Sequence, residues 1–171
     1  MISPSKQIVI QEVLPKLVDL IPEISVSENT TAKPFFSFGS EDDLNRYIKA
    51  TNSVNYPLIW MLPSVNTYNY VNNRVTRRLL LIVATIERRI DISNEQRFAD
   101  SFSNTLFPIR DYLIHILRHS GVSNIKGEID TYEFPRYIQE ETSVIDNWDA
   151  IRIECNVEFN NKQCIKTFNF V

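Results

Sequence analysis

Two histidines and an aspartate fall at a spacing that could bring them to one metal ion. Asp111, His115 and His119 follow one another at intervals of four, so a helix would place them on a single face. Zinc-protease helices carry a glutamate between their histidines, and the sequence places no such residue and no further strong ligand. A histidine near a helix C-terminus is also favoured by the helix dipole. We therefore expect a solvated helix face, no metal and no other cofactor.

The two cysteines, Cys155 and Cys164, are the next groups with chemical potential. A cysteine paired with a histidine can act as a nucleophile. Cys155, however, lies on the apolar side of an alternating segment, where burial keeps a thiol protonated and unreactive. The apolar surroundings of both residues favour buried thiols over a disulfide between neighbouring strands. We expect no catalytic residue and no enzyme activity.

Charged residues gather in two further places. Around one apolar segment lie five arginines, Arg74, Arg77, Arg78, Arg88 and Arg89. They could form a patch that faces a phosphate or a partner, or they could be outward charges on a solvated sheet. Arg77 and Arg78 must point to opposite faces of a strand, so these two cannot share a patch. Around a polar stretch lie four carboxylates that we interpret as loop charges, not as an acid–base pair, namely Glu140, Glu141, Asp146 and Asp149.

Composition excludes several functional classes. Only 3 of the 171 residues are glycine, so no loop can cradle phosphates as Walker or dinucleotide-binding motifs do. The net charge of −3 lacks the basic excess that is typical of nucleic-acid binders. The chain begins without a signal-peptide pattern and has no apolar run of bilayer length, so we expect synthesis in a cytoplasm and no membrane partner. Its length suits one domain over residues 1–171.

Hydrophobic periodicity predicts three helices. The first covers Ser5–Leu20, contains Pro15 and should bend or divide there. A short second helix starts at Ser40, an N-cap residue followed by acidic residues. The longest covers Ser93–Ser120, begins with a capping-box pattern and should kink at Pro108. This last helix carries a long apolar stripe, so we expect it to pack across a sheet.

The remaining apolar segments predict strands. They are a weak strand or loop at Ile24–Val26, then Pro34–Phe38, Tyr56–Pro63, Arg77–Glu87, Thr131–Ile138, Trp148–Phe159 and a returning Gln163–Phe170. Pro135 indicates an edge strand or a bulge. The clean alternation of Trp148–Phe159 indicates a half-buried antiparallel strand. The order predicts an α+β fold, with a mostly antiparallel sheet, the long helix across one face and an N-terminal helix.

We expect one core that includes Trp60, Ile82, Phe102, Ile153 and Val157. Between two of the strands, residues 64–76 are expected to form a long, polar, protruding connection. The segment has about 13 residues and no glycine, which is unusual for a compact turn or a flexible linker. Its tyrosines suit a protein interface, or alternatively pack back on the sheet from a hairpin tip. The candidate interface residues are Asn66, Tyr68, Tyr70, Val71, Asn72 and Arg74.

This order of elements resembles the small α+β proteins that form rings in the head–tail neck of tailed bacteriophages, the tail terminator (tail-completion) family above all. The resemblance rests on four segments, Ser5–Leu20, the run Tyr56-Pro57-Leu58-Ile59-Trp60, Arg78–Ile86 and Phe98–Arg118. The short aromatic run is also similar to neck proteins of phages that infect gut Bacteroidetes, the crAss-like group included. The final predicted hairpin is stronger than this family pattern leads one to expect.

The resemblance implies a tail-terminator-like fold and a structural virion protein of the head–tail connector (neck) ring or tail terminator. Its expected partners are copies of itself in a homo-oligomeric ring and other neck, portal or tail proteins. Genomic DNA would pass through the ring without sequence-specific binding. Such a protein is made in the host cytoplasm and resides in the virion. The alternative is a small non-catalytic binding or adaptor module.

Overall fold

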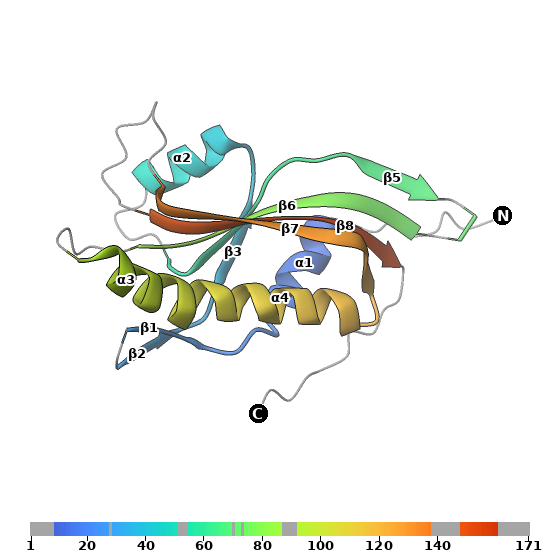
Figure 1. The fold of residues 1–171 in the computed structure, drawn as a ribbon. Helices are drawn as coiled ribbons and strands as arrows, with labels where there is room; N and C mark the ends of the chain where they lie inside the picture. The colour runs from blue at the N-terminus through green and yellow to red at the C-terminus, as the bar shows by residue number, and fades with distance from the viewer. Residues whose placement is uncertain are drawn as a thin grey trace.

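The computed structural model describes residues 9–27, 29–50, 55–69, 71–72, 74–86, 92–137 and 148–160. The fold is α+β, as the sequence predicts. A six-stranded sheet carries one long helix across one face and a short helix on the opposite face (Figure 1). The strands run in the order β3-β4-β6-β8-β7, and β5 pairs beside β6. All neighbours are antiparallel except β3 and β4.

The strands of this sheet are β3 (Phe35–Phe38), β4 (Leu58–Met61), β5 (Asn66–Asn69), β6 (Arg74–Ile86), β7 (Ser123–Tyr137) and β8 (Trp148–Asn160). A separate two-stranded sheet consists of β1 (Ile24–Ser27) and β2 (Thr30–Ala32). Strands β6 and β8 pair along their whole length, from Arg74 opposite Asn160 to Ile86 opposite Trp148. This long pair is the centre of the sheet and determines where its two ends lie.

The helices are α1 (Ile10–Val18), α2 (Glu41–Ala50), α3 (Asn94–Arg97), η1 (Phe98–Leu106) and α4 (Phe107–His119). The last three form one continuous helix, in which η1 is a π-helical segment. The Phe107 N–H donates to the Phe102 carbonyl, five residues earlier. The wider turn immediately precedes Pro108, whose ring clashes with the carbonyl four residues before it in an α-helix. The irregularity that the sequence predicts at Pro108 is thus a π segment. In α1, Pro15 lies inside a single helix.

Two hydrophobic cores lie on opposite faces of the sheet. The long helix and α1 cover one face, where Phe102 packs with Ile153 and Val157. The other core lies beneath α2 and includes Trp60 and Ile82. The prediction of a single core was wrong. Successive strand residues point to opposite faces, so Trp60 and Ile82 lie on the side away from the long helix.

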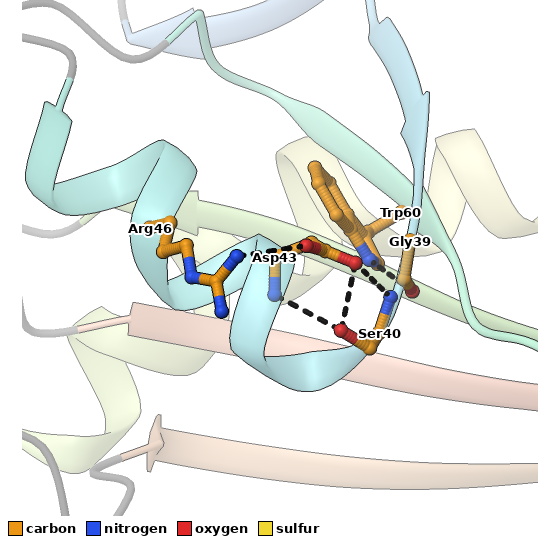
Figure 2. A network of polar contacts seen from close by, with 5 residues as sticks. All are labelled: Gly39, Ser40, Asp43, Arg46 and Trp60. Atoms are coloured by element: carbon orange, nitrogen blue, oxygen red, sulfur yellow. Dashed lines mark hydrogen bonds and ion pairs between the residues drawn. The ribbon is translucent and has the colours of Figure 1, made fainter.

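Helix α2 is held at the sheet by a network around its first turn (Figure 2). The Ser40 hydroxyl accepts from the Asp43 N–H at 3.1 Å, which confirms Ser40 as the N-cap residue. The Asp43 carboxylate accepts in return from the Ser40 N–H at 2.9 Å and hydroxyl at 2.7 Å. The Trp60 indole N–H donates to the Gly39 carbonyl at 3.0 Å. Gly39 has a φ of +155°, and a Cβ there would lie 2.8 Å from the Asp43 Cβ.

Two strand predictions were wrong in extent. Residues 64–76 are not a polar connection, because they include β5 and the start of β6. Strand β7 begins at Ser123, well before Thr131. It is nevertheless an edge strand with a register shift around Pro135, as predicted. The predicted strand at Gln163–Phe170 and the first residues of the N-terminal helix lie outside the described residues.

Candidate interaction surface

The main candidate surface is the hairpin formed by β5 and the first residues of β6. Asn66 lies opposite Arg77, and Asn69 lies opposite Arg74. Strand β4 pairs with the other half of the same β6 edge, where Met61 lies opposite Leu81. The chain therefore follows one edge of β6 from the core out to the hairpin. Figure 1 shows this hairpin reaching past the end of α4.

Exposed valines lie on either side of β5. Val71, at the hairpin turn, is 98% exposed, and Val65, just before β5, is 78% exposed. The backbone at Val71 is held by a hydrogen bond, because the Val71 N–H donates to the Asn69 side-chain oxygen at 3.1 Å. Asn72 of the predicted interface is also exposed. The tip thus holds an apolar side chain in water at a defined position, and its burial against a partner would be favourable.

The sequence left two alternatives for the tyrosines of this hairpin, namely contact with a partner or packing back on the sheet. Tyr68 is half-buried and packs against the core beneath the long helix, so it follows the second alternative. Asn66 points to the same side, where its side-chain oxygen accepts from Arg77 Nη1 at 3.3 Å. Tyr70 lies outside the described residues. Thr67 and Asn69 alternate with these positions and are exposed.

Arg77 fixes the base of the hairpin. It is only 3% exposed, and its Nη2 donates to the Leu62 carbonyl at 3.3 Å while Nη1 donates to Asn66. Burial lowers the pKa of this guanidinium from its ordinary value. The side chain joins β5, β6 and the segment between β4 and β5. The hairpin is therefore anchored in the fold, and its tip has a defined position relative to the core.

The sheet face beyond α2 carries charges that are paired across strands. The ion pairs are Arg74–Glu158 (2.9 Å), Lys126–Glu158 (3.4 Å), Arg78–Glu154 (2.5 Å) and Arg152–Glu154 (2.5 Å). Arg78 points to this face and Arg77 to the other, as predicted. Arg74, the last member of the predicted interface, belongs to this network. The outward-charge alternative therefore describes Arg74 and Arg78, while Arg88 and Arg89 lie outside the described residues.

The interpretation of Asp149 as a loop charge was wrong. Strand β8 begins at Trp148, and its register places Asp149 opposite Thr85. Asp149 is 0% exposed and accepts from Arg97 Nη1 at 2.8 Å, while Arg97 is 1% exposed. This buried ion pair joins the start of β8 to α3. Glu140, Glu141 and Asp146, the other three carboxylates, lie outside the described residues.

The described residues considered above for nucleophilic chemistry or metal binding lie on β8 and α4. Burial raises the pKa of the Cys155 thiol to about 11, so the thiol is protonated near neutral pH. His115 and His119 are exposed on α4 with ring centres 4.6 Å apart, and Asp111 pairs with Arg110 at 2.8 Å. Across the described part of the chain, no group of three or more His, Cys, Asp or Glu side chains could hold a metal ion.

Comparison with known proteins adds no identification. No family model matches the chain, and no curated protein matches its sequence. Among the helices within the described ranges, none has both the length and the apolar character needed to cross a membrane. The β5–β6 hairpin combines exposed apolar side chains with an anchored base.

Proposed function

We propose that the chain is a structural virion protein of a tailed phage, in the head–tail connector (neck) ring or the tail terminator. It would act through protein–protein contacts made by the β5–β6 hairpin. The observation that carries the proposal is the hairpin itself, whose tip residue Val71 is 98% exposed. The α+β architecture, with an N-terminal helix and a long helix across the sheet, agrees with the family resemblance stated above.

The anchored base makes the hairpin suitable for assembly. Arg77 and Tyr68 hold β5 against the body of the protein, so little conformational freedom remains to be lost on binding. Burying one valine side chain contributes about 1.5–3 kcal/mol. Burial of Val65 and Val71 at an interface would therefore contribute favourable binding free energy, because both side chains are exposed in the separate subunit. The buried Cys155 thiol, with its raised pKa, is unsuited to nucleophilic chemistry.

The overall charge suits a ring through which DNA passes. Phosphate contacts by lysine and arginine supply most non-specific DNA affinity. The chain has a net charge of −3, and on the face beyond α2 Arg74 and Arg78 are already paired with carboxylates. Weak attraction to phosphates would let DNA move through the ring without being held.

The proposal is tested in particles. An antibody against the chain should label the head–tail junction of purified phage particles seen by electron microscopy. Val71→Asp should lower incorporation, whereas Val9→Asp, at another exposed valine in the body of the protein, should leave it unchanged. Absence of the chain from particles, together with a monomer that binds one host or phage protein, would instead support the adaptor alternative.

A further inference from the structure

The long helix buries a charged residue where α-helical spacing predicts an aromatic one. Phe98 precedes the core residue Ile109 by 11 residues, which is about three turns of an α-helix and places both on one face. Arg97 precedes Ile109 by 12 residues, so an unbroken α-helix would turn it about 120° away from that face. The structure has the reverse arrangement, with Phe98 46% exposed and Arg97 1% exposed. The residue that faces the core is therefore displaced by one position along the chain.

The π-helical segment η1 accounts for this displacement. A π turn closes between residues five apart instead of four, as in the bond from the Phe107 N–H to the Phe102 carbonyl. Since η1 lies between Arg97 and Ile109, one additional residue is taken up on the way from one to the other. This path then covers about the same rotation as 11 residues of an α-helix. It brings Arg97 to the core face and turns Phe98 toward solvent.

The observed arrangement is favoured by two features and opposed by a third. Arg97 Nη1 donates to the buried Asp149 carboxylate at 2.8 Å, and this contact requires Arg97 on the core face. Pro108 disfavours an α-helical turn before it, because its ring would clash with the carbonyl four residues earlier. Against these, Phe98 remains partly in water, although its ring stacks on that of the core residue Phe102 with centres 5.4 Å apart. The balance therefore depends on the buried ion pair.

We propose that η1 gives the long helix two registers on the sheet, of which the Arg97–Asp149 pair selects the observed one. In the second register η1 is α-helical, Phe98 takes a core position and Arg97 reaches solvent. Helix register shifts occur on microsecond to millisecond timescales. The register decides whether the Phe98 ring belongs to the surface, where it contacts Phe107 edge-on at 5.5 Å, or to the core. This inference does not rest on the proposed function, because it concerns the long helix and not the hairpin.

The test compares the exposure of Phe98 in the purified full chain and its variants. Hydroxyl radicals oxidise exposed aromatic side chains, and mass spectrometry of the peptides gives the rate for each residue. In the wild type Phe98 should be oxidised much faster than the buried Phe102. Asp149→Leu would leave Arg97 as an unpaired charge in the core, so the helix should take the second register. Oxidation of Phe98 should then fall to the rate of Phe102. Stability is still lost in this variant, because the ion pair is gone and the proline opposes the second register.

A deletion in η1 provides the matched control. Asn104 is an exposed residue of η1, and without it one residue fewer separates Arg97 from Ile109. An unbroken α-helix of that length keeps Arg97 on the core face and turns Phe98 about 80° away from Ile109. The second register is then no longer available. The variant without Asn104 should therefore fold, and Phe98 should stay reactive in it, both with the native Asp149 and with Asp149→Leu.

Three results would overturn the two registers. They are oxidation of Phe98 that is unchanged by Asp149→Leu, oxidation that falls equally with and without Asn104, and a variant without Asn104 that does not fold. Deleting Asp111, an exposed residue of α4, should by contrast unfold the protein, because it rotates the core residues after it by about 100°. If circular dichroism shows that Asp149→Leu is unfolded, Asp149→Asn replaces it and should lower the oxidation of Phe98 in the same way. None of these results depends on incorporation into particles, so the two proposals fail separately.

Discussion

Breaking the buried ion pair between Arg97 and Asp149 should destabilise the protein strongly. The two side chains are 1% and 0% exposed, and the Nη1–Oδ1 distance is 2.8 Å. Replacing Asp149 with alanine leaves a guanidinium in a site without its carboxylate. Removing one partner of a buried pair costs about 3–5 kcal/mol. Since domains of this kind are stable by about 5–15 kcal/mol, the variant should lose a large share of its stability.

The assay is urea unfolding followed by circular dichroism, with the free energy of unfolding extrapolated to water. The double variant Arg97→Met with Asp149→Leu removes both charges and should lie within about 1–2 kcal/mol of the wild type, because desolvation offsets much of the attraction in a buried pair. Glu158→Gln, at an ion pair with an exposed arginine, is the matched control and should cost about 0–1 kcal/mol. A loss below about 1 kcal/mol for Asp149→Ala would refute this reasoning.

Three further outcomes follow from the described contacts. Phe102→Ala, in the core beneath the long helix, should lower the free energy of unfolding by about 3–5 kcal/mol in the same urea assay. Gly39→Ala should lower the melting temperature, because its Cβ would lie 2.8 Å from the Asp43 Cβ; an unchanged value would mean that α2 shifts freely. Hydrogen bonds from the Ser40 hydroxyl and N–H lower the pKa of Asp43. The contribution of the Asp43 carboxylate to stability should be complete above its ordinary pKa and lost as the pH falls through the lower value of the folded protein. Asp43→Asn should therefore reduce the loss of stability that occurs below about pH 4, measured by urea unfolding at a series of pH values.

Segments with strong hydrophobic periodicity were predictable from sequence. The long helix follows from a capping pattern and an apolar stripe, and the structure contains the capping box at Ser93 and Gln96. Strand β8 follows from its alternation, with Ile153 and Val157 in the core. Asp149 could have been found by the same signal. It lies two residues before Ile151, on the face that the alternation assigns to the core.

Other elements gave no clear signal for physical reasons. In β5 the inward positions hold Asn66 and Tyr68, so polar residues stand where alternation requires apolar ones. In β7 the register shift inserts two residues between Lys126 and Ile129, so the core side is kept but the alternation is interrupted. Beyond Ile129 the positions on the core side hold Thr131 and Glu133, which are polar and exposed. The split of the core was hidden because Leu58–Met61 is apolar on both faces. The interface prediction drew on composition alone, which cannot distinguish the half-buried Tyr68 from the exposed Val71.

The central strand connects the interaction surface to the most deeply buried part of the protein. Strand β6 runs from Arg74 in the hairpin to Ile86, and it pairs with β8 along this whole length. At the far end of that pair, Asp149 lies opposite Thr85 and binds Arg97 of the long helix. A force applied to the hairpin tip is therefore transmitted along a continuous backbone into the core. A hairpin connected to the core in this way can hold a partner at a fixed position, as proteins that join rigid assemblies must do.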